Sequence, residues 1–329
     1  MHTLQRMRQR FNIPVAGVSI GHAVDHKIKT GTTVCLFDQP AVAAIHIMGA
    51  SPGTRETELL NPEFTVDEVD ALVFSGGSAF GLDAASGVQA WLREHNRGIQ
   101  LDPVRIPIAP CAILFDMRND GDKDWGRYPP YRELGYEAIS SAGPNPELGQ
   151  VGAAFGAATA NTPGGFGMAS TTLSTGGTIF TAAVVNAVGS PMVGDTEHFW
   201  AAPFEENNEF GGRGLPHPWP TDAKEARTKS GQRVAGANTT LAMVITDVAL
   251  TAAQAKRIAI AAHDGFSRAL YPVHTPADGD LIFVASTGAV ETDEEALLDL
   301  GVLAGNTTAR AIARGVYEST QAQHNNENE

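Results

Sequence analysis

Charged residues are sparse in this sequence of 329 residues, and cysteine is almost absent. Charged side chains make up 18% of the chain, and 23 Lys and Arg stand against 37 Asp and Glu, for a net charge of −14. Because nucleic acids and anionic membranes attract basic patches, this balance argues against either as a partner. Cys35 and Cys111 are too few for a disulfide framework or a thiolate metal site, so we expect two reduced thiols.

Long hydrophobic runs are also missing. The first ten residues are basic but lack the apolar stretch of a secretory signal. No later apolar run approaches the roughly 18 residues that a membrane span requires. We therefore expect a soluble cytoplasmic protein that does not bind membranes. A chain of this length can bury a large core without disulfides or metals.

Short, continuous apolar runs are abundant, and hydrophobic residues make up 43% of the chain. Such runs suit strands that are buried on both faces, with helices packed outside them, and they predict an α/β fold. We expect strands over 15–20, 33–37, 41–48, 71–74, 179–188, 241–248 and 280–285. Helices are expected up to Leu92, over 251–270 and over 292–316, with Gly301 and Gly305 interrupting the last, while residues 321–329 are expected to fray.

The segment Gly76-Gly77-Ser78 lies between an expected strand and an expected helix, where a nucleophile elbow or a phosphate loop would lie. Neither pattern is met, because position 80 is Phe and Gly81 is not followed by Lys. We therefore expect Ser78 to cap the helix. His22 and His26 have the spacing of metal ligands, but they follow an expected strand, so no metal site is predicted.

Prolines, a Gly-Gly pair and scattered charge break the pattern over residues 197–238, which we interpret as an exposed linker. It ends at Asn238, and Thr239 opens the next expected strand. If the peptide bond before Thr239 is cleaved, the new α-amine, with an ordinary pKa of roughly 7.7 to 8.0, can act as general base for the Thr hydroxyl. The alternative is a plain Asn-Thr turn. The same Asn-Thr-Thr triplet recurs at Asn306, where Asn306 or Thr307 is expected to cap a helix.

Two closely spaced carboxylates occur in Asp278-Gly279-Asp280, at the start of an expected strand. Paired carboxylates perturb each other's protonation and can orient a hydroxyl or an ammonium. The alternative for this tripeptide is an ordinary turn.

Several of these stretches together resemble one family, the self-cleaving amide hydrolases. This family includes L-aminopeptidase/D-esterases, β-peptidyl aminopeptidases and endo-type nylon-oligomer hydrolases. The resemblance spans most of the chain and rests on six ordered segments: Gly17–Ala23, Ser51–Leu60, Phe74–Ala85, Val184–Gly189, Asn238–Leu241 and His274–Asp280. It implies a four-layer αββα sandwich that acts on small peptides or oligoamides without a cofactor.

The resemblance also implies roles for particular residues. Thr239 matches the nucleophile and Asn238 the residue before the cut, which would divide one structural domain into a large chain, 1–238, and a small chain, 239–329. Asn186 matches the side chain that stabilises the oxyanion. Asp278 and Asp280 match the acidic pair of the nylon-oligomer branch. The assembly implied is a homo-oligomer, with a tetramer expected.

Two positions depart from the family pattern. Asn161 replaces a Lys of the nylon-oligomer hydrolases, which removes a charge partner for the acidic pair, and Phe115 replaces a Tyr of some members. We include both, with Gly76, Gly77 and Ser78, in a possible substrate pocket. Two alternatives stay open: an aminopeptidase that captures a free substrate amine, and a non-catalytic or acyl-transferring protein on the same scaffold.

Overall fold

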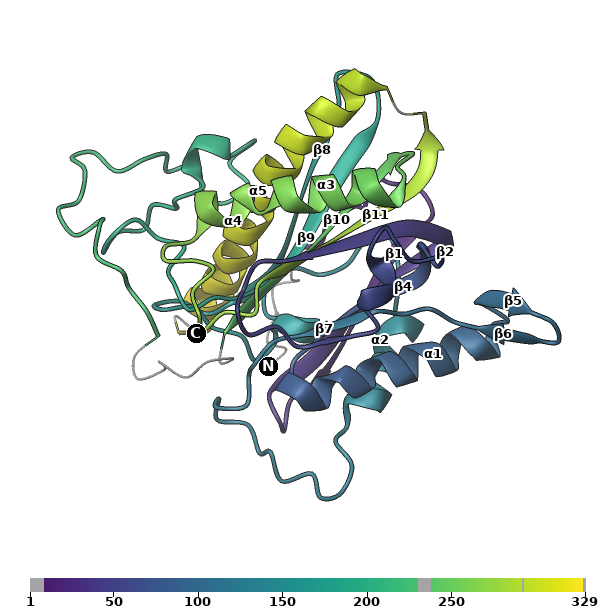
Figure 1. The fold of residues 1–329 in the computed structure, drawn as a ribbon. Helices are drawn as coiled ribbons and strands as arrows, with labels where there is room; N and C mark the ends of the chain where they lie inside the picture. Colours follow the sequence, from purple (N-terminus) through teal and green to yellow (C-terminus); the bar gives the residue numbers. More distant parts are fainter. Residues whose placement is uncertain (1–8, 230–237, 292, 328–329) are drawn as a thin grey trace, which may run out of the picture.

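The computed structural model describes residues 9–229, 238–291 and 293–327 (Figure 1). The helices are α1 (Ala84–Glu94), α2 (Tyr131–Ser140), α3 (Ala252–Ala262), α4 (Asp264–Ala269) and α5 (Glu294–Glu327). The strands are β1 (Val18–Asp25), β2 (Thr30–Ile47), β3 (Thr54–Arg55), β4 (Glu68–Ser75), β5 (Ile99–Leu101), β6 (Val104–Ile106), β7 (Cys111–Ile113), β8 (Gly165–Thr172), β9 (Thr178–Asn186), β10 (Thr239–Val248) and β11 (Leu281–Val290). The α/β fold is confirmed.

One mixed sheet contains all these strands except the β5–β6 hairpin. Its order is β3-β7-β4-β2-β11-β10-β9-β8, with β1 added on β2. The first half of the long strand β2 pairs with β1 and β4, and its second half pairs with β11. The register with β4 shifts between Leu36 and Ala41, and β2 thereby joins two halves of the sheet that pack face to face. Phe74 of β4 stacks on Phe283 of β11 across this contact, with ring centroids 5.9 Å apart.

Three apolar layers separate four layers of secondary structure. The central layer lies between the two halves of the sheet, and it contains Phe37, Phe74, Phe166, Phe180, Met243 and Phe283. A second layer lies between β8–β11 and helices α3, α4 and α5, and a third lies between the β2–β4–β7 half and helices α1 and α2. Figure 1 shows these two groups of helices on opposite sides of the strands. The expected αββα sandwich is thus confirmed.

Alternating side chains explain how β10 serves two layers. Leu241, Met243 and Ile245 belong to the central layer, whereas Ala242 and Val244 face the helices. Because successive side chains of a strand point to opposite faces, an uninterrupted apolar run is required when both faces are covered. The apolar run of β10 therefore reflects burial on both sides.

The predicted interruptions of the last helix are wrong. The expected interruptions at Gly301 and Gly305 do not occur, because α5 is continuous over Glu294–Glu327. This helix also includes residues 321–327 of the segment expected to fray, and residues 328–329 lie outside the described part of the chain. Glycine weakens a helix by about 1 kcal/mol, but tertiary burial decides whether the helix forms. A Cβ added at Gly265 of α4 would lie 2.4 Å from the Gly305 carbonyl oxygen, so the two helices approach closely at this point.

Three further local predictions are wrong. The helix expected over 251–270 is divided into α3 and α4 at His263, whose imidazole donates to the His46 carbonyl at 3.1 Å. Thr307 does not cap a helix but lies inside α5, where its hydroxyl donates to the Leu303 carbonyl at 2.8 Å. Ser78 opens a short 3-10 helix, and its side chain makes no capping hydrogen bond.

The cysteines agree with expectation, whereas the linker expected to be exposed over 197–238 agrees only in part. Phe199, Ala201 and Phe210 are buried against the helices, a 3-10 helix spans Ala202–Phe204, and residues 230–237 lie outside the described part of the chain. Between Glu205 and residue 229 the chain forms no helix or strand. Cys35 and Cys111 are free and buried. None of the helices in the described part of the chain is both long and apolar enough to cross a membrane.

Candidate active site

The ends of two antiparallel strands bring Thr239 and Asn186 together. Thr239, the first residue of β10, is directly paired with Asn186, the last residue of β9. Side chains directly opposite each other in an antiparallel pair lie on the same face of the sheet. Both residues are only 2% exposed. The predicted nucleophile and the predicted oxyanion residue are therefore neighbours in a buried site.

The peptide bond between Asn238 and Thr239 has two donors on its carbonyl oxygen. The Thr239 hydroxyl donates to the Asn238 oxygen at 2.5 Å, and the Gly279 amide donates to the same oxygen at 2.9 Å. A Cβ at position 279 would lie 2.6 Å from the Ser51 carbonyl oxygen and 2.7 Å from Thr239 Oγ1. Only glycine therefore brings its amide this close to the junction without a clash.

The two predicted carboxylates hold the backbone on either side of the junction. Asp280 accepts the Thr240 amide at 2.7 Å and the His274 imidazole Nδ1 at 2.8 Å. Asp278 accepts the Val188 amide at 3.2 Å, and its backbone forms a bridge with Asn238. Burial, and then the negative charge of Asp280, raise the pKa of Asp278.

Asn186 is oriented by partners on both ends of its carboxamide. Its Nδ2 donates to the Phe115 carbonyl at 3.0 Å, while its Oδ1 accepts the Ala158 amide at 3.1 Å and the Lys229 ammonium at 2.9 Å. The Phe115 residue thus contributes its backbone rather than its ring. No sequence motif predicts the contact between Lys229 and Asn186.

Lys229 belongs to the linker and reaches the end of β9. Its backbone amide donates to the Val188 carbonyl at 3.1 Å. Burial lowers the pKa of the Lys229 ammonium to about 7, and the carboxylate of Asp278 opposes that change. Because position 161 is Asn rather than Lys, the sequence predicts that no ammonium lies in this site. The structure has an ammonium beside Asn186 that comes from a different segment, and no sequence motif marks it.

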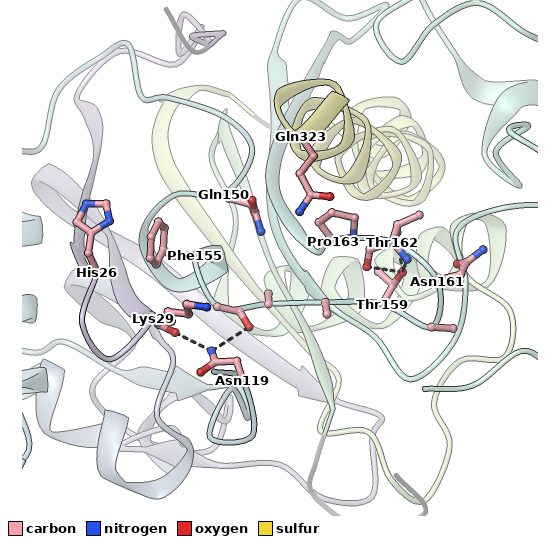
Figure 2. A pocket seen from close by; sticks show the side chains of 14 residues that line it. His26, Lys29, Asn119, Gln150, Phe155, Thr159, Asn161, Thr162, Pro163 and Gln323 are labelled. Atoms are coloured by element: carbon pink, nitrogen blue, oxygen red, sulfur yellow. Dashed lines mark hydrogen bonds between the residues drawn. The ribbon is translucent and has the colours of Figure 1, made fainter. Parts of the chain in front are cut away.

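A cavity of about 690 Å³ lies along the loop that contains Thr159, Asn161 and Thr162 (Figure 2). Its lining includes Ala158, whose amide bonds Asn186, and Asn161 from the same loop. It is lined by His26, Lys29, Asn119, Gln150, Phe155, Gly156, Ala157, Ala158, Thr159, Ala160, Asn161, Thr162, Pro163 and Gln323. Among the described residues, this lining contains one lysine and no carboxylate. The prediction that Asn161 belongs to a pocket fits this cavity.

The other predicted pocket residues are not part of this lining. Gly76, Gly77 and Ser78 pack around a buried carboxylate instead: the Gly77 amide donates to Asp116 at 2.7 Å, and a Cβ at Gly76 would lie 2.2 Å from Asp116 Oδ2. Asp116 follows Phe115 in the chain, so these glycines support the wall behind Asn186 rather than the cavity.

A metal is not needed to explain these contacts. Over the described ranges, no group of three or more His, Cys, Asp or Glu side chains is placed to hold a metal ion. His22 bonds the Thr33 hydroxyl at 3.0 Å, and His26 lies in the cavity wall.

Comparisons with known proteins identify the family to which the chain belongs. The sequence profile of peptidase family S58 matches residues 13–329. An uncharacterized aminopeptidase of Mycobacterium tuberculosis is 38% identical over 325 residues, covering 93% of each chain. The 6-aminohexanoate-oligomer endohydrolase of Paenarthrobacter ureafaciens is 27% identical over 313 residues, covering 91% of this chain and 81% of the relative.

The fold is also found among solved structures. The L-aminopeptidase D-Ala-esterase/amidase of Ochrobactrum anthropi, described as a variant of the Ntn hydrolase fold, has a TM-score of 0.68 at 17% identity, covering 96% of this chain and 87% of the other. The resemblance inferred from the six segments is confirmed. The chain belongs to peptidase family S58 and is a hydrolase of amide bonds.

Proposed function

We propose that this protein is an autoprocessed N-terminal-nucleophile hydrolase that cleaves amide bonds of small peptides or oligoamides, with Thr239 as the nucleophile. One observation carries the proposal: the Thr239 hydroxyl lies 2.5 Å from the carbonyl oxygen of Asn238, and the Gly279 amide bonds the same oxygen. A hydroxyl beside the carbonyl of its own peptide bond supplies the attacking oxygen, and a backbone donor on the carbonyl oxygen supplies a partner for the oxyanion; an intramolecular acyl shift further requires that the hydroxyl oxygen turn toward the carbonyl carbon.

Self-cleavage would proceed in two balanced steps. Thr239 Oγ1 attacks the Asn238 carbonyl carbon. The Gly279 amide, together with the Nδ2 of Asn186, the residue opposite Thr239, would stabilise the negative oxygen that forms. The C–N bond then breaks, the Thr239 nitrogen gains the proton that the hydroxyl loses, and an ester joins the two parts. Water hydrolyses the ester, which leaves a carboxyl group on Asn238 and a free hydroxyl and amine on Thr239.

The surroundings of Asn238 also favour cutting at this bond. Asn238 is fully buried, and neither polar atom of its carboxamide has a hydrogen-bond partner among the described residues. An unsatisfied buried polar group costs about 1–3 kcal/mol. Release of the chain end after cleavage would relieve that cost and open space in front of Thr239.

Turnover would reuse the same groups on an external amide. The free amine of Thr239 takes the proton from its hydroxyl, which attacks the substrate carbonyl; the substrate C–N bond then breaks, and the departing amine leaves with that proton. The Nδ2 of Asn186 would hold the oxyanion, and Asp280 would keep the start of β10 in place through the Thr240 amide. Water then releases the acyl group from Thr239.

Denaturing intact-mass measurement tests the proposal directly. The active protein should separate into two chains, one ending at Asn238 and one beginning at Thr239. The two chains should stay together under native conditions, since β9 and β10 share a ladder across the cut. A single uncut species of 329 residues in fully active protein would refute the proposed nucleophile.

A substrate that extends from Thr239 into this cavity, whose lining reaches the site through Ala158 but does not include Thr239, would favour an endo-acting hydrolase over an aminopeptidase. A site that captures a substrate ammonium needs an acidic partner, whereas the cavity lining contains Lys29 and several side-chain amides, with no carboxylate among the described residues. An N-acetylated oligoamide and its free-amine counterpart should therefore be hydrolysed at comparable rates. An aminopeptidase would instead cleave the blocked substrate at least about 10-fold more slowly, because its acidic group would lose a charged partner.

Self-association as a homo-oligomer, with a tetramer expected, is part of the proposal. The β5–β6 hairpin supports it, because it presents Ile99, Leu101, Val104 and Ile106 on one face, each at least 36% exposed. Figure 1 shows this hairpin projecting from the body of the molecule. A second copy of the chain would cover these aliphatic side chains.

A further inference from the structure

Lys229 makes three hydrogen bonds to the end of β9 although it belongs to the linker. Its backbone amide bonds the Val188 carbonyl at 3.1 Å. Its Nζ lies 2.9 Å from Asn186 Oδ1 and 3.4 Å from the Asn186 carbonyl oxygen. A lysine side chain loses up to about 2 kcal/mol of rotamer freedom when it is ordered in this way. A surface lysine without a role would not be expected to adopt such a position.

Three contacts together decide which way the Asn186 carboxamide points, and the Lys229 ammonium is the charged one among them. Both groups that face Oδ1, the Ala158 amide and the Lys229 ammonium, are donors, and the group that faces Nδ2, the Phe115 carbonyl, is an acceptor. A flipped carboxamide would place its NH₂ against two donors and its oxygen against an acceptor. The ammonium also draws electron density from the carboxamide, which makes the Nδ2 hydrogens better donors.

We propose that Lys229 is a positioning residue that acts through Asn186: its ammonium fixes the carboxamide oxygen so that Nδ2 is presented to the oxyanion formed at the Thr239 site. This inference rests on the proposed function. Lys229 acts both when the chain cuts itself and when it hydrolyses an external amide, and it is carried by the same linker that the cut releases at Asn238.

Charged groups around Lys229 give its action a pH dependence. Asp278 opposes the loss of the ammonium, and Asp280 with its partner His274 lies behind Asp278. Near Phe115, whose carbonyl bonds Asn186, the charged groups are Asp116 and Arg118. The Arg118 guanidinium lies 5.8 Å from the centroid of the Phe115 ring. Burial has the larger effect and lowers the pKa of Lys229 to about 7. The ammonium is therefore present below neutral pH and is lost as the pH rises through about 7.

The test compares self-cleavage of freshly translated wild-type, Lys229→Met and Lys229→Arg chains over a pH series that spans neutrality. Lys229→Met should cut about 10- to 100-fold more slowly, as expected for loss of a charged hydrogen bond. Lys229→Arg should cut near the wild-type rate at acidic pH and should lack the alkaline decline, because guanidinium stays charged. Lys224→Met, an exposed lysine of the same linker, is the matched control and should behave as wild type.

Each outcome supports or overturns the proposed role of Lys229. Wild-type cutting by Lys229→Met overturns the inference and leaves the proposed function intact, whereas a wild-type chain that never cuts overturns both. If Lys229→Met does not fold, as judged by circular dichroism, the Lys229→Arg profile decides: an alkaline decline identical to that of the wild type overturns the inference.

Discussion

Replacement of Thr239 by Ala is expected to leave a single intact chain and to abolish amide hydrolysis. The Thr239 hydroxyl is the only group that contacts the Asn238 carbonyl through a side chain among the described residues, so neither self-cleavage nor acyl transfer would have a nucleophile. Loss of such a nucleophile lowers kcat by an amount on the order of 10⁶-fold. Intact mass and hydrolysis of an oligoamide measure the two effects.

Thr239→Ser is the matched control for this variant. Serine keeps the hydroxyl and, after cutting, the amine, and it removes only a methyl group from a buried position. Self-cleavage and hydrolysis should therefore persist. If Thr239→Ala still yields chains that meet between Asn238 and position 239, the hydroxyl is not the attacking group.

Replacement of Asn186 by Ala is expected to slow turnover roughly 100- to 1000-fold, the usual cost of removing one donor from an oxyanion site. The change also leaves the Phe115 carbonyl and the Ala158 amide without their partner and removes one of the two acceptors of the Lys229 ammonium. The effect should appear mainly in kcat, since a donor to the oxyanion acts in the transition state. Steady-state kinetics of the processed enzyme provide the measurement.

Asn186→Asp separates the donor from the other roles of this side chain. Aspartate keeps an acceptor for Lys229 but replaces the Nδ2 donor with an oxygen that faces the Phe115 carbonyl. The turnover of Asn186→Asp should be as slow as that of Asn186→Ala. The control is Asn61→Ala, which changes an asparagine whose side chain bonds the nearby Glu58 carbonyl, and its turnover should equal that of the wild type. A rate for Asn186→Asp close to that of the wild type would exclude Nδ2 as the oxyanion donor.

Local sequence predicted the strands of the site better than its helices. The apolar runs that form β9 and β10 are buried on both faces, so nearly every residue along them is apolar or small, and this continuous run is visible in the sequence. The continuity of α5 through Gly301 and Gly305 left no such signal, because helix propensity at a glycine is overridden by packing of the helix on the sheet. The Asn-Thr-Thr triplets illustrate the limit: one opens a strand at the site, and the other lies inside α5.

The residues of the site differ in how far the sequence could identify them. Thr239, Asn186, Asp278 and Asp280 belong to short segments whose combination is specific to the family, and the structure brings them to one place. Lys229 belongs to no motif, and its contact with Asn186 depends on the course of a linker without regular structure. The cavity beside Asn161 likewise combines the turn between β1 and β2, the loop 155–163 and the end of α5.

The sequence by itself determined the class of fold and the family, because these depend on local apolar patterns and on short segments, and it predicted the peptide bond at which a nucleophile would arise. Only the tertiary structure decided that Gly279 places its amide on the Asn238 carbonyl and that Lys229 supplies an ammonium to Asn186. Both contacts join segments that are distant in the sequence, and their distances follow from strand register and close packing, which no local pattern encodes.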